Sequence, residues 1–299
     1  MANLKEIRVR ISSVKSTQQV TSAMKMVSAA KLRKAQDAII QMRPYANGLQ
    51  KILANVTYSL DMSVENQYTA HPEVNRILLI AVASNRGLCG GFNSNITKKV
   101  TDLITNTYAD YNRRGAIDIV AIGKKVSEGL KAKNMKVTKT FHELYENLDF
   151  KAVSDLAQSF MGDFANGTYD KVEIIYNQFK NAAVQKLEVE QFLPVRLNTE
   201  SDQVKVEKGI VIRPDYIFEP SMQEIVDVVI PKSLKIQFFK AILDSLASEH
   251  GARMTAMHIA TDNASELLRE LRLNYNKARQ SSITNEILEI VSGANALKS

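Results

Sequence analysis

The sequence predicts an α+β protein in which a long antiparallel two-helix coiled coil, formed by the N- and C-terminal segments, carries an inserted α/β domain. Residues 1–43 contain neither Gly nor Pro, residues 221–299 form a second long helical tract, and the chain between them alternates strand-like and helix-like segments. The predicted parts are a coiled-coil helix over 1–57, an α/β domain over 75–205, a linker over 206–220 and a second coiled-coil helix over 221–299.

The first helical tract follows a heptad register with a polar middle. Its positions are Leu4, Ile7, Ile11, Val14, Gln18, Thr21, Lys25, Ser28, Leu32, Ala35, Ile39 and Met42. Such spacing is typical of a coiled coil, but four consecutive positions are polar. A second apolar stripe, made of Val20, Met24, Val27 and Ala30, lies beside them. A helix with a displaced stripe must contact more than one neighbour or rotate relative to its partner.

The middle of the chain predicts a small, partly parallel, Rossmann-like α/β domain. Strand-like runs occupy residues 76–83, 117–123, 135–141, 171–179 and 184–192, and helix-like runs lie near 95–112, 124–133 and 150–166. The last two strands are joined by a short turn and are expected to form an antiparallel hairpin. Residues 195–220 show no strong pattern and are expected to form a linker.

The second long helix has a clear start signal. Ser221 followed by Glu224 is a capping-box signature, and Pro231 should kink the helix or restart it. At about 1.5 Å per residue, this helix is long enough to extend about 20 residues beyond the first if both begin at the α/β domain. The apolar residues of that extension, Ile283, Ile287, Leu288, Ile290 and Val291, lie on more than one face. An isolated helix of this kind is unstable in water, so another chain should cover it.

The segment GLCGGFN follows the first buried strand and could be mistaken for a phosphate-binding loop. Its glycines, Gly87, Gly90 and Gly91, do not match the G-x-G-x-x-G spacing, and no G-K-[ST] follows. A tight strand-to-helix turn is the simpler interpretation. The single Cys89 has no evident catalytic partner, and His250 and His258 are eight residues apart and do not form a metal-binding pair. No cofactor, metal or catalytic residue is therefore expected.

The net charge of +7 is concentrated at the start of the chain. Residues 1–51 hold ten Lys and Arg residues against two acidic residues, a net charge of +8, which suits an acidic partner, either protein or nucleic acid. A basic coiled-coil protein that binds nucleic acid is the alternative function, although residues 1–44 contain no aromatic side chain that could stack on bases. There is no apolar run of 18 residues and no signal-peptide pattern.

Several long motifs resemble the γ subunits of F-type ATP synthases. They are IRVRISSVKSTQQVTSAMKMVSAAKLRKAQ, RGLCGGFN, YIFEP, ARMTAMHIATDN and YNKARQSSITNEILEIVSGANAL, and they occur in the family's order over the whole chain. The resemblance implies a central rotor shaft with no active site of its own. In such a complex the shaft transmits rotation of a membrane c-ring to catalytic β subunits and couples proton or sodium transport to ATP synthesis or hydrolysis.

The same resemblance implies partners and contact residues. The coiled coil is expected inside a ring of α and β subunits, with Met24, Arg253, Arg279, Gln280 and Thr284 at β-subunit contacts. Tyr216 and Glu219 of YIFEP are expected to face the c-ring. An ε subunit is expected as a further partner, and δ and other subunits are expected to associate with this chain indirectly. The expected location is the cytoplasmic side of the plasma membrane, peripherally and through the c-ring, with no nucleic acid bound.

Overall fold

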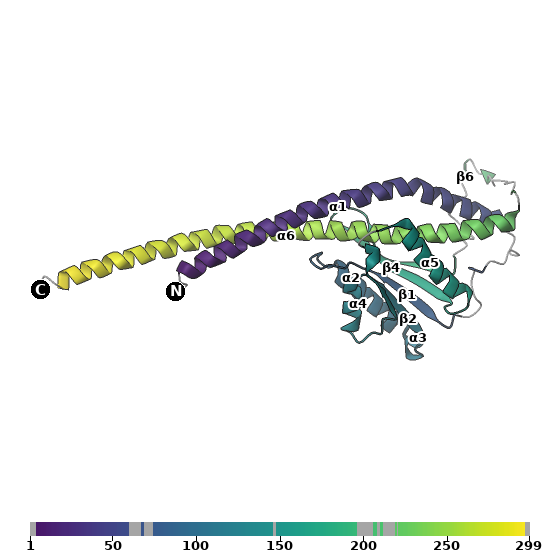
Figure 1. Cartoon of the computed structure of the whole chain (residues 1–299), viewed down its shortest axis with the longest axis horizontal. Helices are drawn as coiled ribbons and strands as arrows, with labels where there is room; N and C mark the ends of the chain where they lie inside the picture. The colour runs from purple at the N-terminus through teal and green to yellow at the C-terminus, as the bar shows by residue number, and fades with distance from the viewer. Residues whose placement is uncertain are drawn as a thin grey trace. The chain divides into compact units, whose positions relative to one another are not determined.

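The computed structural model describes residues 4–59, 67–68, 74–145, 148–195, 206–207, 210–211, 219 and 221–296. The chain forms two compact units, one made of residues 1–29 with 253–299 and the other of residues 30–252. Helix α1 (Leu4–Ser59) and helix α6 (Met222–Ala296) each contribute to both units (Figure 1). The two predicted long helices are confirmed.

In the unit of residues 1–29 and 253–299, α1 and α6 pair in antiparallel fashion through polar side chains. Four contacts join them: Arg8 with Tyr275 at 2.8 Å, Gln18 with Ser265 at 2.7 Å, Thr21 with Thr261 at 2.8 Å, and Lys25 with His258 at 3.2 Å. As the residue number rises along α1, the number of its partner on α6 falls in step. This register is that of an antiparallel two-helix coiled coil.

The polar middle of the heptad stays in the seam of this unit. Thr21 and Ser28 are 9% and 3% exposed, whereas Val20 and Val27 are 58% and 57% exposed. The register of α1 therefore does not rotate to bury the second apolar stripe. Thr21 remains inside and accepts a hydrogen bond from Thr261 of α6, whereas Val20 and Val27 of the second stripe face away from the seam.

The unit of residues 30–252 contains a five-stranded sheet in the order β3-β2-β1-β4-β5. The strands are β1 (Ile77–Val82), β2 (Ile117–Ile122), β3 (Lys139–Phe141), β4 (Lys171–Phe179) and β5 (Gln185–Leu193). All neighbours are parallel except β4 and β5, which form the predicted antiparallel hairpin. The Rossmann-like α/β prediction is confirmed.

Helices cover both faces of this sheet. One face packs against α2 (Phe92–Asp102), α4 (Lys124–Lys131) and the segment between β1 and β2, and the other packs against α5 (Phe150–Ala165) and α6. A short 3₁₀ turn, η2, spans Glu143–Tyr145. Two short strands, β6 (Val206–Glu207) and β7 (Ile210–Val211), form an antiparallel pair inside the predicted linker, which the sequence did not indicate.

The helix predicted over 95–112 is interrupted. A π-helical turn, η1 (Leu103–Thr107), separates α2 from α3 (Ala109–Arg113), and the Tyr108 N–H donates to the Leu103 carbonyl five residues earlier at 2.8 Å. Thr101 and Thr105 each donate their hydroxyl to the carbonyl four residues before, at 2.7 and 2.9 Å. Hydroxyls bonded in this way compete with backbone hydrogen bonds and bend a helix, which accounts for the change of pitch.

Helix α6 begins as predicted but does not restart at Pro231. The Glu224 N–H donates to Ser221 Oγ at 3.2 Å, which confirms the cap. The helix continues through Pro231 to Ala296, so the predicted restart is wrong. Ile230 and Leu234 on either side are 2% and 3% exposed, and this packing holds the helical path through the proline.

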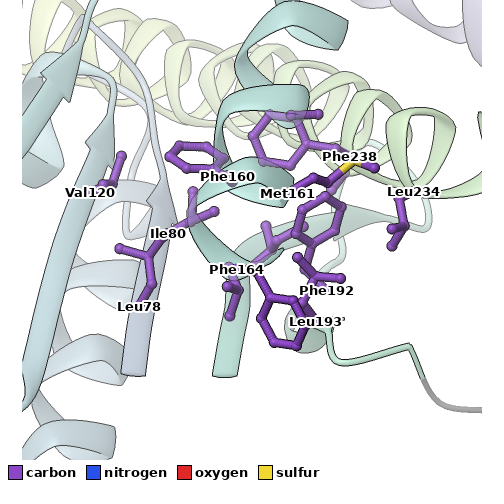
Figure 2. Packing of buried hydrophobic residues seen from close by; sticks show 14 of the residues in the cluster. Leu78, Ile80, Val120, Phe160, Met161, Phe164, Phe192, Leu193, Leu234 and Phe238 are labelled. Carbon is purple, nitrogen blue, oxygen red and sulfur yellow. The ribbon is translucent and has the colours of Figure 1, made fainter. Parts of the chain in front are cut away.

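Residues 230–251 of α6 are enclosed on nearly all sides. Only Lys232 is exposed in this segment. Phe238 packs under the sheet, with its ring centre 5.8 Å from Phe160 of α5 and 5.5 Å from Phe192 of β5 (Figure 2). Ile236 packs instead with Ala46 and Leu49 of α1. The helix therefore lies between α1 and the sheet within this unit.

Hydrogen bonds add to the apolar packing of this segment. Tyr145 donates to Ser245 at 3.0 Å, and the Ser248 hydroxyl donates to the Asn177 carbonyl at the end of β4 at 2.9 Å. Gln237 Nε2 donates to Glu190 Oε1 of β5 at 2.8 Å. Buried hydrogen bonds are directional, so these bonds oppose rotation of α6 against the apolar side chains that surround it.

Asp244 is a buried acid in the same segment, only 5% exposed. Burial raises the pKa of its carboxyl to about 6, because the charged form is poorly solvated. The positive charges of Lys240 and Arg43 act in the opposite direction, and the negative charge of Glu190 adds to the rise.

Replacing Asp244 should remove a pH-dependent part of the stability. The pKa is raised from 3.8 to about 6, so the folded protein loses stability as the pH rises through that interval. We expect Asp244→Asn to raise the free energy of unfolding by about 1–3 kcal/mol above pH 7 and to change it little near pH 4. Denaturant unfolding of the full chain at both pH values measures this. Asp155→Asn, at an exposed position of α5, is the control, and equal pH dependence in wild type and Asp244→Asn would refute the assignment.

Gly123 should be irreplaceable at the end of β2. Its φ is +104°, and a Cβ there would lie 2.0 Å from the Ala83 carbonyl oxygen at the end of β1. We expect Gly123→Ala to lower the free energy of unfolding by more than about 3 kcal/mol, because backbone must move. Gly162→Ala in α5, where nothing lies within 4 Å, should be neutral or stabilising by up to about 1 kcal/mol. Thermal unfolding compares the two, and similar melting temperatures would contradict the expectation.

Candidate protein interface

The GLCGGFN segment forms a tight turn between β1 and α2. Leu88 and Gly90 adopt left-handed backbone angles, with φ of 62° and 59°. The turn uses its polar groups internally: the Ser84 hydroxyl donates to the Arg86 carbonyl at 2.6 Å, and Asn93 Nδ2 donates to Cys89 Sγ at 3.1 Å. These internal hydrogen bonds explain the polar residues of the segment and support its interpretation as a structural turn.

In open α/β folds, ligands bind beyond the carboxyl ends of the strands, where the strand order reverses. In this sheet the corresponding place lies at the ends of β1 and β4, and α6 packs there. Ser248 bonds to the Asn177 carbonyl, and Ala252 packs against the apolar cluster beneath α2. Helix α6 of the chain itself therefore occupies the place where open α/β folds bind a ligand.

The part of the chain that the structure describes has no group of three or more His, Cys, Asp or Glu side chains that could hold a metal ion. None of the helices within this part is long and apolar enough to cross a membrane.

The predicted contact residues near the end of α6 are exposed. Arg279, Gln280 and Thr284 all face solvent within their unit. The Thr284 hydroxyl donates to the Gln280 carbonyl at 2.9 Å, so its hydrogen is already used on its own helix. The guanidinium of Arg279 and the amide of Gln280 remain the groups best placed to reach another chain.

The predicted apolar tip is exposed as well. Its residues are Ile283 at 47%, Ile287 at 55%, Leu288 at 58%, Ile290 at 71% and Val291 at 51%. Because α1 begins at Leu4 and Arg8 already bonds to Tyr275, this part of α6 extends past the start of α1. Its side chains are exposed within this unit, and the expectation that a partner chain covers them stays a prediction.

The other predicted contact residues differ in how exposed their side chains are. Met24 is half-buried beside the Lys25–His258 contact. Arg253 is only 7% exposed, so its side chain is not presented at a surface as the other predicted contacts are. Its role, like that of Met24, stays a prediction. Glu219 is exposed, and Tyr216 lies outside the described residues.

Additional exposed residues of this unit were missed by the sequence analysis. A shallow groove of about 380 Å³ is lined by Gln18, Ser265, Leu268, Arg269, Arg272, Leu273 and Asn276. Leu273 is 57% exposed, and Ile259 and Val9 are 56% and 62% exposed. The available signal was their position outside the heptad seam, where apolar residues are expected to contact another chain. Together with the tip, they add to the exposed apolar side chains of this unit.

The fold and these surfaces define a class of protein: a coiled coil that carries an α/β domain and leaves the end of one helix with exposed apolar side chains. Comparison with known proteins identifies the family. The sequence profile of the family described as ATP synthase matches residues 3–297. The ATP synthase gamma chain of Flavobacterium johnsoniae is 55% identical over 297 residues, with 99% of both chains covered, and that of Cytophaga hutchinsonii is 48% identical over 297 residues, again with 99% of both covered.

Solved structures agree with the sequence relatives. A chain of the Tetrahymena thermophila mitochondrial ATP synthase central stalk and c-ring is 27% identical, with a TM-score of 0.58, and the match covers 81% of this chain and 99% of that one. A chain of the Euglena gracilis enzyme has a TM-score of 0.67 at 19% identity, covers 98% and 94%, and supports the fold alone. The chain belongs to the family of ATP synthase gamma chains. Nothing in these comparisons supports the alternative of a nucleic-acid-binding protein.

Removing the tip should leave the rest of the protein folded. Residues 283–294 are all exposed and belong to the unit of residues 1–29 and 253–299, whereas the sheet belongs to the other unit. We expect a chain that ends at Ser282 to keep the melting temperature of the α/β domain within about 2 °C, since none of residues 283–294 is buried. Near-ultraviolet circular dichroism, which reports the tyrosine environment of the sheet, follows this. Loss of that signal would show that the tip supports the fold.

Proposed function

We propose that this chain is the rotating central shaft of an ATP synthase. Its α/β domain would dock on a membrane ring of c subunits, and its coiled coil would turn inside a ring of α and β subunits. The observation that carries the proposal is the enclosure of α6 residues 230–251 between α1 and the sheet, joined to the exposed outer surface of the coiled coil. Because this part of α6 is packed between α1 and the sheet, the α/β domain can pass torque to the helix.

The proposed mechanism needs no catalytic group on this chain. Each face of the shaft would stabilise one conformation of a neighbouring β subunit over the others, so turning the shaft would change which β subunit releases ATP. Nucleotides would bind to the partners. Proton or sodium flow through the c-ring would supply the torque, and the chain would lie at the membrane surface as a peripheral part of the complex, on the cytoplasmic side.

The exposed groups suit these partners in chemical terms. The guanidinium of Arg279 can bridge a carboxylate with two hydrogen bonds, and the amide of Gln280 can both donate and accept. The apolar tip suits a bearing in which contacts are non-directional and slide without breaking fixed hydrogen bonds. Arg269 and Arg272 add positive charge beside the groove and favour acidic loops of β subunits. Glu219 is proposed to face the c-ring, with an ε subunit bound to the same domain.

A charge introduced at Met24 tests the proposal. In a complex rebuilt from this chain with its α, β and membrane subunits, we expect Met24→Lys to lower the number of ions pumped per ATP hydrolysed at least twofold. The physical reason is that an ammonium group at this position can pair with an acidic β-subunit loop and hold the shaft at one angle. Dye-quench measurement of ion pumping, run beside an ATPase assay, gives the ratio.

Two control variants show whether a loss of coupling comes from the new charge or from any substitution on α1. Met24→Leu keeps the volume without the charge and should pump as wild type does. Lys34→Gln removes an exposed charge elsewhere on α1 and should also leave the ratio unchanged. A chain that does not co-purify with α and β subunits, or a Met24→Lys complex that couples normally, would count against the proposed function or against this contact, respectively.

A further inference from the structure

Leu88, in the GLCGGFN turn, has a backbone conformation that leucine rarely adopts. Its φ is 62°, in the left-handed region, where the side chain crowds the backbone and glycine or asparagine is the usual residue. In the described part of the chain, the only other residue besides glycine with a positive φ is Asn134, at 58°. Asparagine is common in this conformation, so Leu88 is the residue whose backbone strain needs an explanation.

The turn imposes this conformation on Leu88 by holding residues on both sides of it. The Ser84 hydroxyl donates to the Arg86 carbonyl at 2.6 Å, and the Ser84 N–H donates to Asn93 Oδ1 at 3.0 Å. The residue after Leu88, Cys89, is 2% exposed and accepts a hydrogen bond from Asn93. Because Arg86 and Cys89 are both held, Leu88 has little freedom to leave the left-handed region.

The side chain of Leu88 contributes little to the core of its own chain. It is 64% exposed, although Cys89 beside it is buried. A single exposed leucine is common on protein surfaces and needs no explanation by itself. A leucine that is both exposed and strained is different, because glycine would form the same turn without strain. Strained residues of this kind are concentrated at sites that bind ligands or partners.

Leu88 lies at the edge of the sheet where β1 and β4 end. These strands are parallel neighbours, with Ala81 opposite Ile175, so the turns that follow them lie at the same edge. Val184, in the turn between β4 and β5, is 51% exposed. This edge therefore presents two apolar side chains to solvent, each on a short turn.

Helix α6 leaves this unit at the same edge of the sheet. Ser248 donates to the Asn177 carbonyl near the end of β4 at 2.9 Å, and a Cβ placed on Gly251 would lie 3.3 Å from the Cα of Ala182 in the following turn. The unit ends at residue 252, and α6 continues beyond it. Under the proposed function, the edge from which the coiled-coil helix departs would face the ring of α and β subunits, and the opposite edge would face the membrane.

We propose that Leu88 is an apolar anchor that inserts into an apolar pocket on a partner chain of this ring. A leucine that its turn already holds outward loses little conformational freedom on binding, and burial of its side chain removes apolar area from water. A few well-placed side chains supply most of the affinity of a protein interface. The inference rests on the proposed function for the identity of the partner, whereas the strain and exposure of Leu88 do not depend on it.

The variant Leu88→Gly shows whether this side chain supports the fold. We expect the full-length variant to melt within about 2 °C of wild type, because relief of strain offsets the greater freedom of glycine in the unfolded chain. Asn134→Gly, at the other positive-φ position, is the matched control and should behave in the same way. Differential scanning calorimetry measures both. A fall of more than about 3 °C in Leu88→Gly alone would make Leu88 a structural residue and overturn the proposal.

Binding is measured in a complex of this chain with purified α and β subunits. Hydroxyl-radical footprinting compares the oxidation of Leu88 in the free chain and in the complex, and we expect oxidation to fall at least about fivefold on assembly, because the side chain becomes buried. We also expect labelled Leu88→Gly to exchange out of the complex, against excess unlabelled chain, at least about fivefold faster than wild type. Leu88→Met keeps an apolar side chain, so it and Asn134→Gly should exchange within about twofold of wild type.

The other outcomes contradict the inference. Equal oxidation of Leu88 in the free chain and in the complex would overturn it, as would unchanged exchange of Leu88→Gly. Protection of Leu88 that appears in the free chain as its concentration rises would also overturn it, because the pocket would then belong to a second copy of this chain. A chain that does not co-purify with α and β subunits would contradict the proposed function and this partner together, whereas co-purification with Leu88 still exposed would contradict the inference alone.

Discussion

The enclosure of one stretch of α6 is the constraint on which the rest of the structure depends. From residue 230 to residue 251 the helix has only one exposed position, Lys232. Apolar contacts with α1 on one side and with the sheet on the other hold it in place. Hydrogen bonds that Gln237 and Ser248 donate, and one that Ser245 accepts from Tyr145, oppose its rotation. The apolar contacts stabilise without direction, whereas the hydrogen bonds specify an angle. A rotating shaft needs both stabilisation and a fixed angle at the place where torque is applied to it.

The unit of residues 1–29 and 253–299 meets a different demand. Its seam contains polar pairs such as Gln18–Ser265 and Thr21–Thr261, where a tighter coiled coil would have leucines. Its outer surface carries Val20, Ile259 and the apolar tip, where an isolated protein would have charges. This arrangement, with polar side chains in the seam and apolar side chains outside, is expected if part of the stability comes from surrounding subunits. The polar pairs then fix the register, and the apolar outer residues form surfaces on which partners slide.

Local rules predicted most of the fold. The heptad, the capping box at Ser221 and the hairpin of β4 and β5 each depend on a few neighbouring residues, and each was found where expected. The π turn after α2 was missed, because it follows from threonine hydroxyls bonding to carbonyls one turn earlier, which a hydrophobic pattern does not register. The absence of a restart at Pro231 likewise depends on packing between segments that are distant in sequence. In the candidate interface, the exposed tip could be inferred from helix lengths, but the burial of Arg253 and the groove beside Arg269 are tertiary facts.

The enclosure of α6 residues 230–251 between α1 and the sheet would let torque pass between the α/β domain and this helix. The most direct measurement is single-molecule rotation. A probe is attached through Lys151→Cys, an exposed position of α5, in a complex of this chain with α and β subunits fixed to a surface. On addition of ATP, the account predicts that the probe rotates in one direction in regular steps. Continued ATP hydrolysis while the probe stays still would contradict it.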